Sequence, residues 1–166
     1  MRTNLFVWSA VGLMLLGAGC SAVRPPSVTS DTSGSTAPTP PSASARLDLS
    51  GNGLESVPSD VFSRTDLEEL DLSDNRLTGA LPGEIRHLQN LRVLDASGNM
   101  MTGLPAEIGQ LSELESLDLS DNRLTGLPLE LGNLSGLRRL DLSGNDISRH
   151  DLDIIRVGLE NAEIVE

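Results

Sequence analysis

Residues 67–90 read LEELDLSDNRLTGALPGEIRHLQN, and this stretch decides the fold because the chain repeats it. Residues 91–113 read LRVLDASGNMMTGLPAEIGQLSE, and residues 114–136 read LESLDLSDNRLTGLPLELGNLSG. A shorter copy, LRRLDLSGNDIS, begins at residue 137, and a weaker first copy, SARLDLSGNGLESVPSDVFSRTD, begins at residue 44. Such a regular repeat predicts a solenoid, in which each unit stacks on its neighbours because it cannot bury its apolar side alone.

Each repeat divides into two halves. Apolar and polar residues alternate in LxxLDLSxN, which predicts a short strand with its leucines on one side. The other half, LPxEIGxL, begins with a proline that interrupts the strand and places apolar residues three apart, which favours a short helical or irregular return. Stacked copies therefore predict a parallel sheet along one face of the solenoid.

One asparagine recurs after every predicted strand. We expect these asparagines to lie inside the turns, because an amide offers both donors and an acceptor to backbone groups that the bend leaves unpaired. This asparagine ladder consists of Asn52, Asn75, Asn99, Asn122 and Asn145, at intervals of 23, 24, 23 and 23 residues.

The repeat closely resembles the leucine-rich-repeat family, in its LxxLDLSxNxLTxLPxEIGxLxx form, over about residues 44–166. The resemblance implies an α/β fold, a curved solenoid of five repeats with the parallel sheet on its concave face. It also implies protein binding, since members of this family mostly bind other proteins through side chains exposed on that sheet.

Two departures from the repeat concern the core. Ala96 stands where other repeats carry leucine, and Met101 and Met100 lie nearby, where a flexible methionine would fill the gap. In the first repeat Arg64 stands where a core leucine would align, as expected for an end unit with one side open to solvent.

The last repeat departs from the pattern after Ser148, which is a good helix N-cap. We expect a helix that ends near residues 158–161, followed by a final strand at Ala162–Val165. The apolar face of this helix would consist of Leu152, Ile154, Ile155, Val157 and Leu159. This tail predicts a C-terminal helix/strand cap that closes the core.

The N-terminus has the layout of a secretory signal. Arg2 precedes an apolar run, Leu5–Leu16, which is shorter than the roughly 20 residues of a membrane-spanning helix, and small residues then lead to Cys20. This segment resembles the lipobox of bacterial lipoproteins, although Gly17 stands where that family prefers leucine. The resemblance implies cleavage before Cys20, a diacylglycerol on its thiol and acylation of the new amino terminus. The alternative is an ordinary cleaved signal peptide.

The resulting domain prediction has three parts. Residues 1–19 are the signal peptide, and residues 20–45 are a disordered tether rich in Ser, Thr and Pro, which cannot bury enough apolar area to fold. Residues 46–166 are the solenoid, with the cap from about residue 148. Ser21 after the cysteine favours the outer membrane in Gram-negative lipoproteins, so we expect a lipid-anchored protein of the cell envelope, or alternatively a secreted or periplasmic one.

Composition excludes several classes of function. The chain has 12 basic against 24 acidic residues and a net charge of -12, which excludes nucleic-acid binding. A single cysteine excludes a zinc site of paired thiolates, and we expect no metal and no cofactor. His87 and His150 lie far apart in the predicted solenoid and share no Ser or Cys partner, so the chain is predicted not to be an enzyme.

The strand positions that vary between repeats are the candidate recognition surface. Val93 and Met100 are expected to form an apolar spot within a charged surface, the usual layout of an interface hot region. The candidate partner-binding residues are Arg46, Glu69, Val93, Met100, Ser116, Arg138 and Arg139. The alternative is a solvated surface without a partner, in a structural envelope lipoprotein that has no specific ligand. An enzyme fragment is a third alternative.

An aspartate ladder is predicted beside this surface, because the same strand position carries Asp48, Asp71, Asp95, Asp118 and Asp141. With strands about 4.8 Å apart, repulsion along the row should raise some pKa values or recruit a cation. The DLS triplet is common in the resembled family without metal, and we favour that interpretation.

Overall fold

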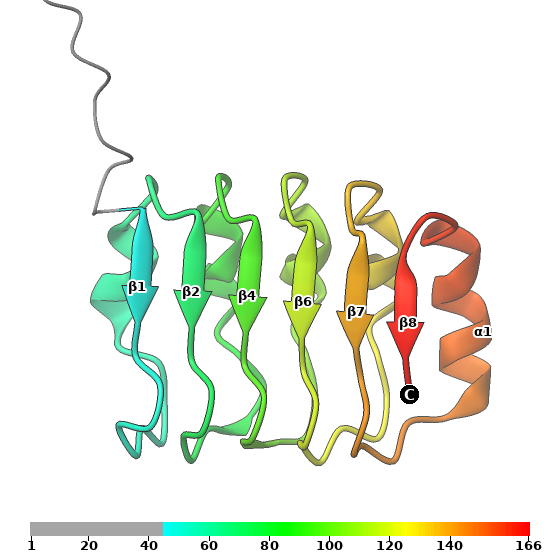
Figure 1. The fold of residues 1–166 in the computed structure, drawn as a ribbon, viewed down its shortest axis with the longest axis horizontal. Helices are drawn as coiled ribbons and strands as arrows, with labels where there is room; N and C mark the ends of the chain where they lie inside the picture. Colours follow the sequence, from blue (N-terminus) through cyan, green and yellow to red (C-terminus); the bar gives the residue numbers. More distant parts are fainter. Residues whose placement is uncertain (1–44) are drawn as a thin grey trace, which may run out of the picture. The chain divides into compact units, whose positions relative to one another are not determined.

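The computed structural model describes residues 45–166, so the predicted signal peptide, Cys20 and nearly all of the predicted tether lie outside the described residues. The described chain repeats a strand, a turn and a 3₁₀ helix (Figure 1). In order, the elements are β1 (Arg46–Asp48), η1 (Ser59–Ser63), β2 (Glu69–Asp71), β3 (Thr78–Gly79), η2 (Gly83–His87), β4 (Val93–Asp95), β5 (Met100–Met101), η3 (Ala106–Gln110), β6 (Ser116–Asp118), η4 (Leu129–Asn133), β7 (Arg139–Asp141), α1 (Arg149–Gly158) and β8 (Glu163–Val165).

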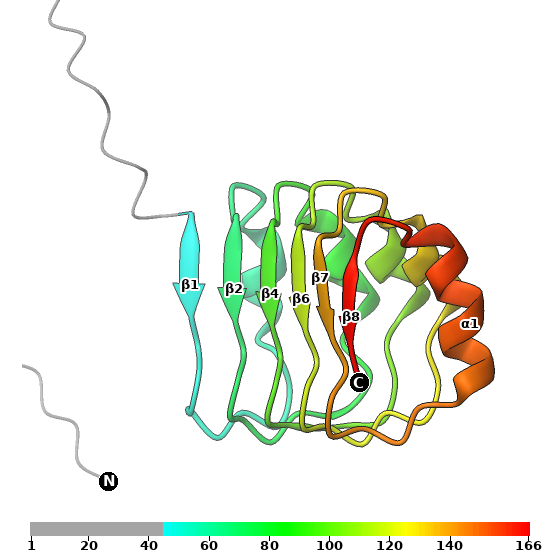
Figure 2. The ribbon, with the colours of Figure 1, turned by 45° about the vertical axis from the view of Figure 1, so that its right-hand side comes forward.

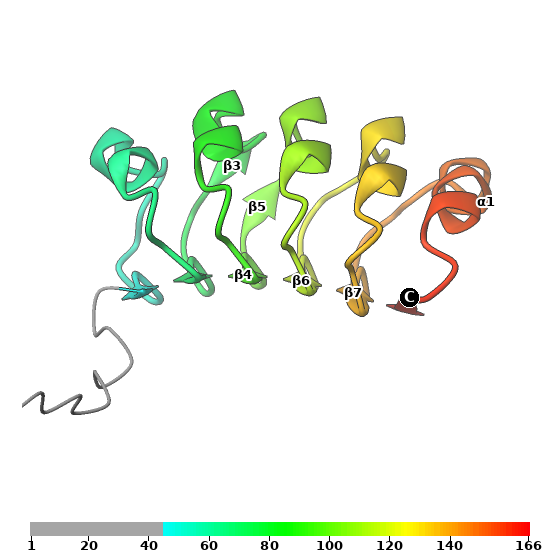
Figure 3. The same cartoon turned by 90° about the horizontal axis from the view of Figure 1, so that it is seen from above.

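The main sheet confirms the predicted solenoid. Strands β1, β2, β4, β6, β7 and β8 pair in this order, all in parallel, and β3 pairs with β5 in a separate two-stranded sheet. The six-stranded sheet lies on one side of the repeats and the 3₁₀ helices lie on the other (Figure 3). We call the exposed side of this sheet the sheet face.

The core between these layers is aliphatic. Leucines of each LxxLDL segment are buried, and Ala96 and Met101 are buried in the same core with 0% and 1% of their surface exposed. Each fully buried leucine stabilises the fold by about 1.5–3 kcal/mol. Leu47 and Leu49 of the first repeat are only partly buried, because β1 is the edge of the sheet within the described residues.

The asparagines of the second to fifth repeats bind backbone groups inside the turns. Asn122 is representative: its Nδ2 donates to the carbonyl of Leu119 at 3.1 Å and to that of Ala96, in the preceding turn, at 2.9 Å. Its Oδ1 accepts the N–H of Met101 at 3.0 Å. Asn75, Asn99 and Asn145 make the same pattern of bonds. Asn52 instead lies exposed in the first turn.

Prolines precede all four 3₁₀ helices of residues 45–166, at a position where a residue without a backbone N–H costs no hydrogen bond. They are Pro58, Pro82, Pro105 and Pro128.

The C-terminal cap has the predicted helix and strand, but the predicted apolar face of the helix is wrong at Ile154 and Val157, which are exposed. The hydroxyl of Ser148 accepts the N–H of His150 at 3.2 Å at the start of α1, and Leu152 and Ile155 face the core. The helix packs beside η4 (Figure 2), and β8 then adds the last strand of the sheet. None of the helices within residues 45–166 is long enough and apolar enough to span a bilayer.

Candidate functional site

The strand register places the variable positions in one row on the sheet face. Arg46 is opposite Glu69, Glu69 opposite Val93, and Val93 opposite Ser116, and the row continues through Arg139 to Glu163. The residue that follows each of these positions packs in or against the core, and it is Ile164 after Glu163 and a leucine at the other positions. Recognition residues can therefore vary along this row without disturbing the packing beneath it.

Arginine–glutamate pairs join neighbouring strands along this face. Arg46 lies 3.2 Å from Glu69, and Arg138 lies 3.3 Å from Glu115. Arg92 donates to Glu115 through Nε at 3.0 Å, and this hydrogen bond lowers the pKa of Glu115 and raises the pKa of Arg92. Because these groups are solvated, such pairs set the orientation of the side chains more than the stability of the fold.

Each aspartate of the ladder is held by the serine two residues after it. Oδ1 of Asp95 accepts the N–H of Ser97 at 3.0 Å and its hydroxyl at 2.6 Å. The same two bonds recur at the other four positions, Asp48, Asp71, Asp118 and Asp141.

The expected rise in pKa along the ladder is wrong at both ends. The pKa of Asp48 is lowered, mainly by the hydrogen bonds from Ser50. Burial raises the pKa of Asp141, but bonds from Ser143 and Arg139 outweigh it and lower the pKa overall. No cluster of three or more His, Cys, Asp or Glu side chains within residues 45–166 has the arrangement of a metal site.

Val93 is an exposed apolar residue of this face, with 37% of its surface exposed. A shallow pocket of about 140 Å³ surrounds it, lined by Arg46, Glu69, Leu70, Asp71, Val93 and Asp95. Its charged lining consists of three carboxylates and Arg46, and Val93 supplies its exposed apolar side chain.

Met100 does not share this surface, which corrects the expected apolar spot. It lies in β5 and pairs with Thr78 of β3, in the two-stranded sheet, whereas Val93 lies in β4 of the six-stranded sheet. The chain leaves the main sheet at Asn99, so the residue after that asparagine belongs to another side of the repeat.

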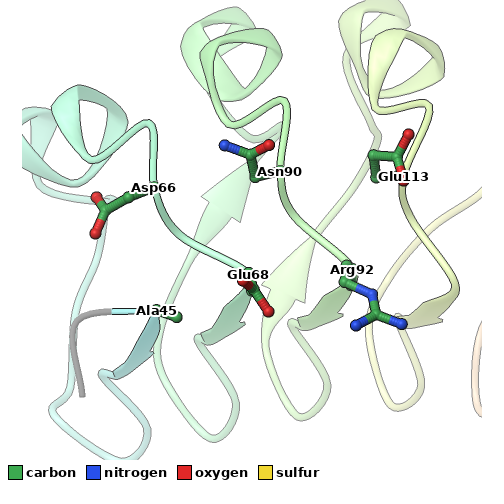
Figure 4. Close-up of a pocket in the computed structure, with 6 residues that line it drawn as sticks. All are labelled: Ala45, Asp66, Glu68, Asn90, Arg92 and Glu113. Carbon is green, nitrogen blue, oxygen red and sulfur yellow. The ribbon is translucent and has the colours of Figure 1, made fainter. Parts of the chain in front are cut away.

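A second hollow, of about 550 Å³, runs along the edge where the strands begin (Figure 4). It is lined by Ala45, Asp66, Glu68, Asn90, Arg92 and Glu113. These lining residues were not predicted, although the repeat carries a signal for them: Asp66, Asn90 and Glu113 all occupy the position before the first leucine of a repeat.

The histidines lie apart from both hollows. His87 ends η2 and His150 is in the first turn of α1, and both are exposed. Cys20, the predicted lipid attachment site, lies outside the described residues.

Comparison with known proteins gives the family of this repeat. Residues 45–101 match a family model described as leucine rich repeat, and residues 112–153 match one described as two copies of leucine rich repeats. The chain carries leucine-rich repeats. Together with the stacked parallel strands, these matches make the described residues a leucine-rich-repeat solenoid.

Solved leucine-rich-repeat structures are similar to this one. A leucine-rich-repeat protein of Leptospira interrogans is 44% identical with a TM-score of 0.64, over 67% of this chain and 28% of that chain. The BIR3–SERK2 complex of Arabidopsis thaliana gives 42% identity and a TM-score of 0.57, over 61% of this chain and 56% of that chain.

A curated relative is similar over a shorter stretch. The CCR4-Not complex 3′-5′-exoribonuclease subunit Ccr4 of Neurospora crassa is 49% identical over 51 residues, 31% of this chain. The chain spans only 6–7% of the length of the curated relatives it matches. The exoribonuclease activity in the name of Ccr4 is therefore a property of Ccr4.

Proposed function

We propose that this protein is a lipid-anchored module of the cell envelope that binds a protein partner through its sheet face. The observation that carries the proposal is the difference between the strand positions that face the core and those that are exposed. The core position in the middle of these strands is always leucine, whereas the exposed row changes from Arg46 through Glu69 and Val93 to Ser116 and Arg139. A rigid framework that presents a varied surface suits recognition.

Residue types on this face also favour protein binding. An exposed valine within a ring of charged groups matches the apolar centre and polar rim of protein interfaces. The similar BIR3–SERK2 assembly is a complex of two proteins that also carries this fold.

The anchor rests on the sequence of the N-terminus. An apolar run followed by small residues and Cys20 supports export and lipidation. Two or three acyl chains on one residue give stable membrane attachment, since a single chain is marginal. The following Ser/Thr/Pro-rich stretch would hold the repeats about 25–30 Å from the bilayer if it behaves as a flexible coil.

Site-specific photo-crosslinking tests the binding. A photoreactive amino acid at Val93 is compared in living cells with one at Glu84, which is exposed on η2. We expect a discrete protein adduct from Val93 and none from Glu84. Adducts from Glu84 alone, or from neither position, would contradict the proposal.

Intact mass tests the anchor. The protein extracted from the membranes of its own cells should have a mass that begins at Cys20 and includes acyl chains. Cys20→Ser should abolish both the added mass and the membrane fractionation. An unlipidated mass in the non-membrane fraction would contradict the anchor and indicate a secreted or periplasmic binding module.

A structural envelope lipoprotein without a ligand is the second candidate. The ion pairs of the sheet face favour it, because Glu69 and Glu115 already have arginine partners within the chain. This candidate predicts that charge reversal at Glu69 and Arg139 leaves the function of the protein in its cells unchanged.

A further inference from the structure

We infer that the sheet face over β2 and β4 binds a cationic, extended segment of the partner protein. A lysine or arginine of that segment lies across Val93 with its charged end between Asp71 and Asp95. This inference rests on the proposed function, because it names the chemistry of the partner that the same face would bind.

The carboxylates at the centre of the face are uncompensated. Oδ1 of Asp71 and of Asp95 accepts the serine bonds, but among residues 45–166 no arginine forms an ion pair with either carboxylate. Asp141 differs, because Arg139 lies 2.8 Å from its Oδ2. The arginines of this face therefore leave the middle of the ladder available to a cation from outside.

Strand pairing sets the distance between these two carboxylates. Asp71 and Asp95 are partners in the β2–β4 register, so their backbones are separated by one strand spacing, about 4.8 Å. A cation placed between them is attracted by both, and attraction at such short range remains substantial even near a solvated surface.

The pocket around Val93 suits the rest of a basic side chain. Lysine and arginine pack their methylene stems on apolar surface while the charged end stays solvated. Val93 supplies that apolar surface. Glu69, Asp71 and Asp95 line the same pocket of about 140 Å³ together with Arg46, which is already paired with Glu69.

The larger hollow gives the segment room to continue. Glu68 lines it and is next in the chain to Glu69 of the first pocket, while Arg92 lines it and is next to Val93. Neighbouring residues of the chain therefore line the two hollows at β2 and at β4. Figure 4 shows Asp66, Glu68 and Glu113 along this hollow, so a second basic residue would also meet carboxylates.

Other occupants fit less well. An acidic segment would be repelled by the aspartates. A purely apolar segment would remove water from the carboxylates without supplying a cation or a hydrogen-bond donor in its place. The phosphates of a nucleic acid would meet the same repulsion.

Three fluorescent decapeptides test the inference, with alternating Lys-Thr, Ser-Thr and Glu-Thr sequences. Binding to the full chain is followed by fluorescence anisotropy at low and at physiological salt. We expect the lysine peptide to bind at least about tenfold more tightly than the neutral peptide, with a preference that salt weakens. Equal affinity for all three peptides would overturn the inference.

A pair of double variants separates the pocket from the overall negative charge. Asp71→Asn with Asp95→Asn keeps an acceptor for each serine but removes two charges at the pocket. Glu84→Gln with Glu130→Gln removes two charges from exposed positions on η2 and η4. We expect about a tenfold loss of lysine-peptide affinity in the first pair and less than about twofold in the second.

Two outcomes separate this inference from the proposed function. Equal losses in the two double variants would overturn the cationic segment, because general attraction would then explain binding. A partner adduct from Val93 that forms equally well with Asn at positions 71 and 95 would also overturn it, while protein binding by the sheet face would stand.

Discussion

Asn122 in one turn of the solenoid donates to the carbonyl oxygen of Ala96 in the turn before it, at 2.9 Å. The two residues are 26 positions apart in the chain, so this bond joins successive repeats. The same amide also satisfies carbonyls of its own turn and accepts the N–H of Met101. Each buried asparagine therefore links successive repeats by hydrogen bonds, whereas the side chains between the repeats are mainly leucines.

Asn122→Ala should destabilise the fold strongly. It leaves several buried backbone groups without partners, and one such group costs about 1–3 kcal/mol, so we expect the free energy of unfolding to fall by about 2–4 kcal/mol. Urea denaturation, monitored by circular dichroism, measures this loss. Asn52→Ala is the matched control, because Asn52 has the same repeat position but is exposed. Equal losses in the two variants would show that burial of the amide is irrelevant.

Close packing of η3 against η4 depends on Gly109. A Cβ added there would overlap the carbonyl oxygen of Glu130, which is backbone and cannot swing away. We expect Gly109→Ala to lower the free energy of unfolding by about 1–3 kcal/mol. Gly103→Ala, where an added Cβ meets nothing within 4 Å, should change it little. If urea denaturation gives the same free energy of unfolding for Gly109→Ala as for the unaltered protein, this close packing is contradicted.

The C-terminal cap should contribute to stability through one face of α1. Ile155 is completely buried, whereas Ile154 is 40% exposed. Ile155→Ala should cost about 2–5 kcal/mol and Ile154→Ala about 0.5 kcal/mol or less, measured by thermal and urea unfolding. Similar costs for both would mean that the helix does not close the core in this orientation.

Asp141 should make stability depend on pH. Its pKa in the folded chain lies below the ordinary value of 3.8, so its stabilising contribution is fully present above that value and is lost as the pH falls through the folded pKa. Asp141→Asn should therefore lower the free energy of unfolding at pH 7 and lower it less at pH 3, below the ordinary pKa of an aspartate. Urea midpoints at both pH values measure the difference. A loss of the same size at low pH would assign the effect to packing instead of charge.

Much of the fold could be predicted because each repeat carries the same pattern of apolar and polar residues. The alternation in LxxLDLSxN located β1, β2, β4, β6 and β7, and Ser148 located the start of α1. The contact between Gly109 and Glu130 could not be predicted, because it depends on how closely two returns stack and leaves no periodic signal.

The site was predictable in part. Register follows from the repeat, so the row through Val93 is where the sequence places it. Met100 was misplaced, because the chain turns away from the main sheet at Asn99. The pKa of Asp48 is lowered, because the two hydrogen bonds from Ser50 oppose the repulsion that was expected to raise some pKa values of the ladder.

Hydroxyl-radical footprinting with mass spectrometry tests the central claim, that the sheet face is where this protein meets a protein partner. Oxidation of Val93 on the sheet face is compared with oxidation of Leu129, which is 59% exposed on η4. Both rates are measured in the purified full chain and in membranes of the native cells. The account predicts that Val93 is protected in the membranes while Leu129 reacts as in the purified chain. Protection of Leu129 with Val93 unchanged would place the partner on the opposite side of the repeats and contradict the account.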